Sequence, residues 1–529
     1  MSEAKEIIFE QEAREKLAGG IKQLANAVRA TLGPKGRNVG LERGWGAPTI
    51  TNDGNSIVKD VELADQYEQM GVAMAQEVAA KIKEKCGDGT TTGTLLLDAL
   101  VEHGIKYIAA GASPIGIKRG IEKATTALLN ELENNAIPVK GKEDTQNIAT
   151  VSASGNSEIG TFIAEAIEKV GREGVVTIEE AKGTETVIET VEGMQFDRGY
   201  ISPYFATNQE KMRVEMENPS ILLVEKKITS IQELLPILQS VASTGRELLL
   251  ISEDVEADAL ATLVVNKIRG TLKVAAVKAP GFGDNRKAML EDLAVLTGAT
   301  LISEDAGVVL KDAQAEVLGS AERVIVTKDT TTIVGGKGEH KAIGTRIAQL
   351  ETQAEKSTSS YDKEKLIERK AKLKGGVAVI RVGAATEPEL KAKKQMFEDS
   401  LNSTKAALEE GIVAGGGIAL FHAGKILNTL SLEGDEALGA KLVEKALEAP
   451  TRQIVSNTGF DGSVIVEQLR DADEKVGFNA LTEKVEDLIA AGVLDPVKVV
   501  KNCLIFSTSV AGVILISEAL IGDAPEEEE

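Results

Sequence analysis

The stretch Cys86–Gly93, written CGDGTTTG, joins two segments that are rich in helix-forming residues. QEVAAKIKEK (76–85) precedes it, and TLLLDALVEHGIKYI (94–108) follows it. Within the stretch, two glycines flank one aspartate and three threonines follow, residue types that weaken the interior of a helix and favour its ends. We therefore predict helices at about 61–85 and 92–109, with a tight loop between them.

The residues of this loop leave two interpretations open. Glycines let backbone amides approach an anion, an aspartate can bind Mg²⁺, and hydroxyls at a helix start can cap amides or contact phosphate oxygens. The loop is therefore either a capped connection, closed by Asp88 or Thr90, or a phosphate site. It is not a P-loop, because no GxxxxGK[ST] pattern occurs and no strand precedes it. A second DTTT, at 329–332, lacks the glycines and predicts a turn or strand.

The two ends of the chain have similar, mainly helical sequence patterns, and the pattern in the middle of the chain differs from them. Apolar spacing predicts a helix over 10–32, and turn residues around RNVGLE and APTITNDG predict a β-hairpin over 37–54. Between about 175 and 335, short β-rich runs such as VVTIEE, ELLLIS and TLISED alternate with helical segments, as in a mixed α/β domain. Helical patterns return after 376. We predict a multidomain α and α/β protein, with a domain inserted into a helical one that both ends of the chain complete.

Composition narrows the classes of function. The 529 residues suggest three or four domains, and a net charge of −22 argues against nucleic-acid binding. No run approaches the roughly 20 apolar residues of a membrane span, so we expect a soluble protein without a membrane partner. Two distant cysteines (Cys86 and Cys503) fit a reducing compartment, and three histidines offer little material for a zinc site or a catalytic triad. The first residues resemble neither a secretory nor a transit signal.

Two other glycine segments could serve the same ligand as the loop. TLGPKG (31–36) follows a predicted helix, and AGGGIAL (414–420) permits close backbone approach. Asp53, Asp399 and Asp495 could contribute carboxylates. Taken alone, each of the three is better explained as an aspartate in a turn or on an exposed helix face, where this residue is common.

The motifs TLGPKGRNV, APTITNDG, GDGTTT, VEGMQFDRGYISPYF, LATLVVN, VKAPGFGDNRKAML, GGVAVIRVGAATE, EEGIVAGGG and LDPVKV occur in this order. The series resembles the GroEL-type, group I chaperonins of the 60 kDa chaperonin family, from about residue 5 to residue 521. The resemblance implies an equatorial ATPase domain (2–134 and 410–529), an intermediate domain (135–191 and 378–409) and an apical domain (192–377). It also favours phosphate binding by the loop.

The resemblance also implies a role for individual residues of a nucleotide site. ATP, Mg²⁺ and K⁺ are the expected cofactors. Asp399 would position the attacking water with help from Asp53, and Asp88 would bind Mg²⁺. The nucleotide would contact Thr31, Leu32, Gly33, Pro34, Asp88, Gly89, Thr90, Thr91, Thr92, Gly416, Asn479, Ala480 and Asp495.

In such chaperonins the apical domain binds non-native polypeptides and a 10 kDa co-chaperonin. The matching residues here are Tyr200, Tyr204, Phe205, Leu235, Leu238, Leu260, Val264 and Val265. Without the resemblance, these apolar helix faces would be assigned to the core. The implied protein is an ATP-dependent folding machine of heptameric rings in the bacterial cytoplasm, with a processed organellar form as the alternative location. A divergent paralogue, acting as a protein-binding ring with weak ATPase cycling, is the alternative function.

Several positions depart from the family pattern. Asn52 stands where a lysine is usual, and Gly93 and Leu481 stand where alanine is usual. The segment 40–45 differs in a loop used between subunits, and PEEEE replaces a Gly-Gly-Met tail. We expect these changes to affect ATPase rate, cation response, ring stability and substrate handling.

Overall fold

The structure, a computed structural model, describes residues 5–43, 48–171, 174–181, 183–209, 211–303, 307, 309–357 and 359–524. It forms two compact units. The first contains residues 1–165, 182–185 and 382–529, and the second contains 166–181 and 186–381. The first unit thus combines both ends of the chain, as the sequence predicted for the helical part. Gly44, Trp45 and the tail 525–529, where we expected departures from the family, lie outside the described residues.

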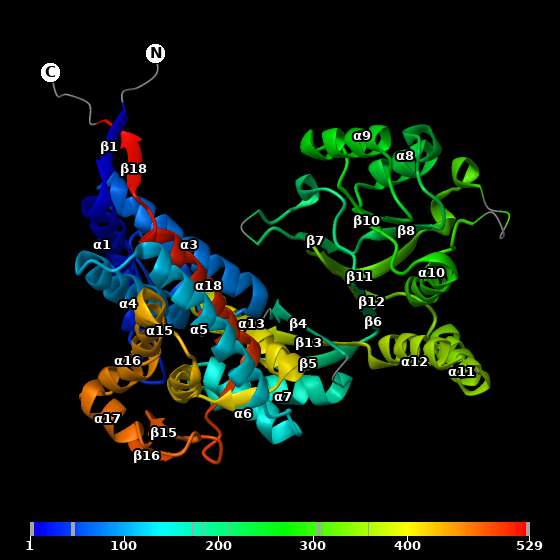
Figure 1. The fold of residues 1–529 in the computed structure, drawn as a ribbon. Coiled ribbons are helices and arrows are strands. Elements are labelled where there is room, and N and C mark those ends of the chain that lie inside the picture. The colour runs from blue at the N-terminus through cyan, green and yellow to red at the C-terminus, as the bar shows by residue number, and fades with distance from the viewer. Residues whose placement is uncertain are drawn as a thin grey trace. The chain divides into compact units, whose positions relative to one another are not determined.

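The first unit is predominantly helical (Figure 1). Its helices are α1 (Glu10–Arg29), α2 (Gly54–Asp60), α3 (Gln66–Cys86), α4 (Thr90–Ala109), α5 (Pro114–Asn134), α6 (Lys142–Ser152), α7 (Ser157–Val170, which ends in the second unit), α13 (Glu387–Glu410), α14 (Ile418–Ala423), α15 (Gly434–Ala446), α16 (Ala449–Asn457), α17 (Gly462–Leu469) and α18 (Val497–Leu515).

Helix α18 is the central helix of this unit and packs against α3, α4 and α5. Its apolar residues join those of α1, α3, α4, α5 and α15 in one core. The expected face of α1 is confirmed, because Leu17, Ile21, Leu24 and Val28 are all buried. Among the described residues, only α18 is long and apolar enough to cross a membrane. Because 56% of its most apolar stretch is buried in the core, this is weak evidence for a span.

Short antiparallel strand pairs connect distant parts of the first unit. The strands are β1 (Lys5–Phe9), β2 (Val39–Leu41), β3 (Thr49–Thr51), β14 (Ile412–Ala414), β15 (Val476–Asn479), β16 (Lys484–Asp487), β17 (Leu494–Pro496) and β18 (Ala519–Asp523). The pairs are β1 with β18, β2 with β3, β14 with β17, and β15 with β16. β1 and β18 lie side by side, with Lys5 opposite Asp523 (Figure 1). The predicted hairpin is the β2–β3 pair.

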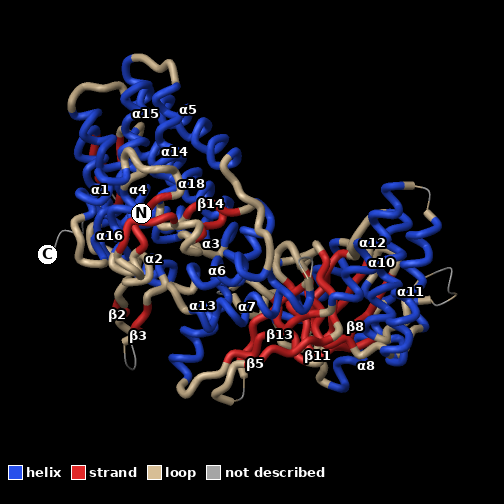
Figure 2. The backbone as a smooth tube through the Cα atoms, turned by 90° about the horizontal axis from the view of Figure 1, so that it is seen from below, coloured by secondary structure: helices blue, strands red, loops and turns tan. Residues whose placement is uncertain are grey.

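The second unit is built around a mixed sheet (Figure 2). Its strands are β4 (Val175–Glu180), β5 (Val187–Val191), β6 (Gly193–Phe196), β7 (Val214–Glu217), β8 (Ser220–Val224), β9 (Leu248–Ser252), β10 (Val274–Lys278), β11 (Gly319–Val326), β12 (Thr331–Gly336) and β13 (Val377–Val382). Its helices are α8 (Leu235–Thr244), α9 (Ala257–Ile268), α10 (Gly283–Thr297), α11 (His340–Lys356) and α12 (Ser360–Gly375). The predicted alternation of strand and helix is therefore confirmed.

Seven strands form the main sheet in the order β10-β9-β8-β11-β12-β6, with β7 also paired to β11. Strands β8, β9 and β10 are parallel, and a smaller sheet has the order β4-β13-β5. The expected strand at TLISED is wrong for its described part, because Ile302 forms only a single bridge to Val224. The expected apical segment 192–377 lies wholly in this unit, whereas the expected intermediate segments are divided between both units.

Candidate functional site

A cavity of about 1320 Å³ lies in the first unit. Its walls come from distant segments: the end of α1 (31–34), the β3–α2 region (48–56), the α3–α4 loop, the end of α6, the first half of α13, and residues around 416, 479 and 495. All thirteen residues expected at the nucleotide line it, together with Asp53 and Asp399. The structure therefore brings every residue of the predicted nucleotide site together.

The α3–α4 loop takes a backbone conformation that depends on glycine. Gly87 (φ +76°) ends α3, and Gly89 (φ +91°) precedes α4. The first main-chain bond of α4 runs from Gly93 N to Gly89 O (3.0 Å), and no side chain caps this end. The amides at the start of a helix have no intrahelical acceptor, so those of Thr90 to Thr92 can meet an anion.

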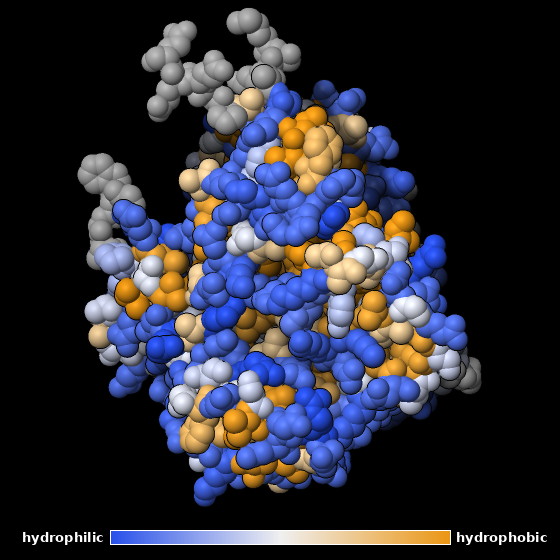
Figure 3. All heavy atoms as spheres, turned by 60° about the vertical axis from the view of Figure 1, so that its left-hand side comes forward, coloured by the Kyte–Doolittle hydropathy of each residue, from blue (hydrophilic) through white to orange (hydrophobic). Residues whose placement is uncertain are grey.

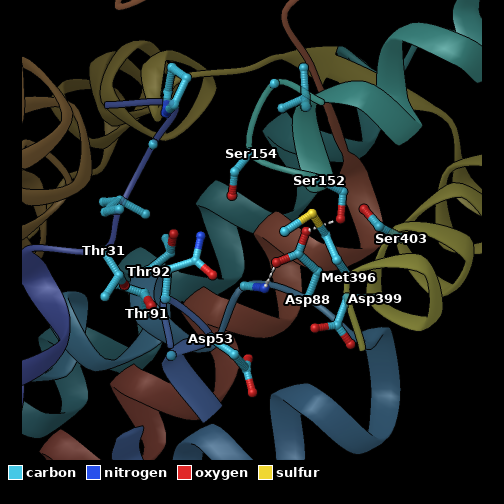
Figure 4. Close-up of a pocket in the computed structure, with 18 of the residues that line it drawn as sticks. Thr31, Asp53, Asp88, Thr91, Thr92, Ser152, Ser154, Met396, Asp399 and Ser403 are labelled. Atoms are coloured by element: carbon cyan, nitrogen blue, oxygen red, sulfur yellow. Dashed lines mark hydrogen bonds between the residues drawn. The ribbon is translucent and has the colours of Figure 1, made fainter. Parts of the chain in front are cut away.

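Asp88 has room for a cation. Its Oδ1 accepts a hydrogen bond from Gly89 N (2.6 Å), and its Oδ2 accepts one from the Ser152 hydroxyl (2.6 Å; Figure 4). A carboxylate has about four acceptor positions, so further lone pairs remain. No cluster of three potential metal ligands occurs among the described residues. This donor set fits Mg²⁺, which usually binds one or two carboxylates together with phosphates and water.

Asp399 lies on α13, in a set of charged side chains. It forms an ion pair with Lys83 of α3 and accepts a hydrogen bond from Gln395 (2.8 Å). Burial raises the pKa of Asp399 to about 7; Lys83 opposes this shift, whereas Asp53 adds to it. Burial works against the charge of Lys83, but the carboxylates of Asp399 and Asp53 raise its pKa overall. An aspartate with this pKa can accept a proton near neutral pH.

Asp53 also has a structural role. Its carboxylate caps α2 by accepting hydrogen bonds from Asn55 N (3.2 Å), Ser56 N (3.0 Å) and the Ser56 hydroxyl (2.6 Å). Figure 4 shows Asp53, Asp88 and Asp399 around one space. The negative charges of Asp53 and Asp88 both add to the raised pKa of Asp399.

Asp495 and Asn479 lie in another part of the cavity wall. Asp495 is on β17, where burial and then the charge of Asp88 raise its pKa to about 7. The Asn479 side chain donates to Glu486 (2.8 Å) and accepts from Leu481 N (3.0 Å), so both its polar atoms stabilise the β15–β16 turn. In this structure Asn479 shapes the wall, and its contact with a nucleotide stays a prediction.

The segment 31–34 is held from two sides. The Thr31 hydroxyl donates to Val28 O (2.8 Å), and Asn457 of α16 donates to Leu32 O (2.9 Å). Gly33 has φ +82°, so the chain turns sharply after α1.

Sequence reasoning missed Lys83, Ser152, Gln395, Asn457 and Cys503. Each contacts a predicted site residue or segment, or lines the cavity. Gln395 carried a weak signal, because it is one helical turn before Asp399. The others carried none, because their contacts join parts of the chain distant in sequence or depend on which side of a helix meets its neighbour.

The expected apical surface is only partly exposed. Tyr204 (65%), Leu235 (43%) and Val265 (43%) present much of their area, and Tyr200, Leu260 and Val264 are half-buried. Phe205 (0%) and Leu238 (6%) are buried in the core of the second unit, which corrects their assignment to this surface. Leu238 faces inward with Leu234 and Val241 because these positions share one helix face.

Comparison with known proteins identifies the family. The TCP-1/cpn60 chaperonin family matches residues 24–525. A protein called Chaperonin GroEL 3, from Protochlamydia amoebophila (strain UWE25), is 66% identical over 529 residues, which cover all of this chain and 99% of that protein.

Proposed function

Because the chain belongs to the TCP-1/cpn60 chaperonin family and is of the GroEL type, we propose that it is an ATP-driven folding machine. It captures non-native proteins on an apolar surface of the second unit and encloses them in a heptameric ring beneath a 10 kDa co-chaperonin. The observation that carries this proposal is the cavity of the first unit, in which an uncapped helix start and three aspartates surround one space.

Different residues of the cavity have different roles in phosphoryl transfer. This reaction depends chiefly on positioning the reactants and on neutralising charge. The amides and hydroxyls of Thr90 to Thr92 hold the phosphates at the start of α4. Asp88, oriented by Ser152, holds the metal. When bound, Mg²⁺ neutralises phosphate charge. Gly416 and Asp495 form the wall that contacts the rest of the nucleotide.

Asp399 orients the attacking water and accepts its proton. The carboxylate is mostly buried, and Lys83 and Gln395 fix its direction. Because its pKa lies near 7, it is partly ionised at neutral pH and can still hold a proton. Asp53 lines the same cavity and helps Asp399 to position the water. Its carboxylate is oriented by the hydrogen bonds through which it caps α2.

Capture of clients uses exposed apolar side chains of the second unit. Tyr204, Leu235 and Val265 have the largest exposed fractions of the expected set. Unfolded proteins share exposed apolar groups rather than a defined sequence, so such a surface suits many clients. A ring with weak ATPase cycling is not favoured, since Asp53, Asp88 and Asp399 meet in one cavity.

The test measures ATP turnover and the refolding of an aggregation-prone enzyme, with and without a 10 kDa co-chaperonin. Asp399→Ala should bind ADP normally but hydrolyse ATP at least about 100-fold more slowly, because the proton acceptor is lost. Glu409→Ala, which changes an exposed position on the same helix, is the matched control. Undiminished turnover in Asp399→Ala would remove this residue from its role. Replacing K⁺ by Na⁺ in the same assay tests the proposed potassium requirement.

A further inference from the structure

Helix α18 carries two side chains that donate hydrogen bonds to backbone carbonyls at the start of α4. The thiol of Cys503 donates to Gly89 O (3.2 Å), and the hydroxyl of Ser507 donates to Gly93 O (2.7 Å). The donors are four residues apart on α18, and the acceptors, Gly89 just before α4 and Gly93 in its first turn, are also four residues apart. Two neighbouring helices are thus joined at matching turns, directly beside the loop that holds Asp88.

A side chain on Gly89 would strain the backbone, which has φ +91°, and would displace side chains of α18. A Cβ atom there would lie 2.7 Å from Val499 Cγ1 and 2.8 Å from Cys503 Sγ. A Cβ on Gly93 would lie 2.2 Å from Ile82 Cδ1 of α3. Cys503 and Ser507 are both fully buried. The first turn of α4 therefore rests on α3 and α18, and an alanine at 93 would require only the end of the Ile82 side chain to shift.

We propose that Cys503 and Ser507 are positioning residues of the nucleotide site, which fix the first turn of α4 so that its free amides point into the cavity. This inference rests on the proposed function, because it assigns those amides to phosphate. The Gly89 carbonyl accepts both the Cys503 thiol and the Gly93 amide. Loss of the thiol leaves this carbonyl with the main-chain bond alone and removes one of the two side-chain hydrogen bonds from α18 to the start of α4.

The protonation state of the Cys503 thiol agrees with its role as a hydrogen-bond donor. Burial raises the pKa of Cys503 well above that of a free thiol, so the group keeps its proton at neutral pH. Burial also raises the pKa of Cys86, to about 11. A protonated, buried thiol donates but does not act as a nucleophile. Serine can replace it as a donor, whereas alanine cannot.

Helix α18 also links two parts of the cavity. It begins at Val497, two residues after Asp495, and reaches the phosphate loop at Cys503. The position of Asp495 relative to the amides of α4 is therefore set by one rigid element. A variant that loosens the contact between α18 and α4 should weaken binding of the whole nucleotide.

The experiment measures Mg-ADP affinity by titration calorimetry, with the melting temperature recorded for each variant. Cys503→Ala and Ser507→Ala should each weaken Mg-ADP binding about 3-fold to 10-fold, the effect of one lost hydrogen bond. Cys503→Ser should stay within about 2-fold of wild type, because it restores the donor. Thr508→Val is the matched control: its hydroxyl donates only within α18, to Leu504 O and Ile505 O.

Two failures can be told apart. If the wild type binds Mg-ADP and Cys503→Ala and Ser507→Ala bind it equally well, the positioning role is overturned. Equal weakening by Thr508→Val would also overturn it, because general destabilisation of α18 would then explain the effect. If the wild type itself binds no Mg-ADP, the proposed function falls and the inference falls with it. If Cys503→Ala does not fold, Ser507→Ala and Cys503→Ser still decide the question.

Discussion

The ion pair between Lys83 and Asp399 should control the pH dependence of ATP hydrolysis. Asp399 must be ionised to accept a proton from water, so the rate should rise with pH through the pKa of about 7 and then level off. Lys83 favours the ionised form. Lys83→Gln removes this charge but keeps a donor, so the pKa of Asp399 should rise and the rate profile should move to higher pH.

The size of the shift follows from the burial of the pair. Lys83 is 21% exposed and Asp399 is 16% exposed. Two unit charges 4 Å apart attract by about 4 kcal/mol at an effective dielectric constant of 20, and access of water reduces this value. A net loss of about 1.4 to 2.7 kcal/mol raises the pKa by about 1 to 2 units. At pH 7 the ionised fraction then falls from about one half to between a tenth and a hundredth, so hydrolysis slows about 5-fold to 50-fold.

The assay is single-turnover ATP hydrolysis between pH 6 and pH 9.5. The rate of Lys83→Gln should approach that of wild type at the alkaline end. Lys81→Gln, which loses an exposed ion pair on the same helix, is the control and should keep the wild-type midpoint. If the midpoint of Lys83→Gln coincides with that of wild type, Asp399 is not the group that sets the profile. A uniform loss at every pH would instead assign Lys83 to nucleotide binding.

Three further predictions concern other parts of the molecule. Ser152→Ala removes the hydroxyl that orients Asp88, so the Mg²⁺ concentration for half-maximal ATPase activity should rise about 10-fold. Leu235→Ser combined with Val265→Ser should weaken suppression of client aggregation, measured by light scattering, because both side chains are 43% exposed. Asp292→Asn should lower the free energy of unfolding of the second unit by about 3 to 5 kcal/mol in urea, because two arginines pair with this buried carboxylate.

Each of these predictions has a matched comparison. Ser154→Ala should leave the Mg²⁺ requirement unchanged, and an equal rise would contradict the role of Ser152. Leu238→Ser should destabilise the second unit, since this side chain is buried; a client-specific loss without destabilisation would restore Leu238 to the binding surface. Glu291→Gln removes the more exposed partner of Arg346 and should cost less than about 1 kcal/mol, so an effect as large as that of Asp292→Asn would refute the argument from burial.

The local sequence pattern was sufficient to predict secondary structure where a segment forms that structure from residues near one another in the chain. The apolar spacing in α1 predicts its buried face, and the glycines around Asp88 predict the interruption between α3 and α4. The TLISED segment was mistaken for a strand because β propensity depends on having a partner edge, and Ile302 meets β8 at only one position. The pairing of β13 with β5 joins residues about 190 positions apart, and no local pattern encodes it.

Side-chain contacts in the candidate site were also unpredictable where they join residues distant in sequence. The residue types expected at a nucleotide site were visible in the sequence, and the resemblance indicated which segments belong together. Ser152 and Lys83 were not visible, because each meets its aspartate only after helices from different parts of the chain have packed. Phe205 and Leu238 were misplaced because an apolar residue in an amphipathic segment can face either way, and only packing decides between the core and the surface.

The position of α18 in the core of the first unit has a consequence for the synthesis of the protein. A ribosome makes the chain from its N-terminus, so α1, α3 and α4 emerge long before α18, the helix that covers their apolar faces. During that interval these faces stay uncovered, as expected for contacts of very large sequence separation. The cavity proposed to hold the nucleotide is also incomplete until Asp495 and Cys503 have been made. We therefore expect a nascent chain that stops before α18 to bind a nucleotide more weakly than the full chain does.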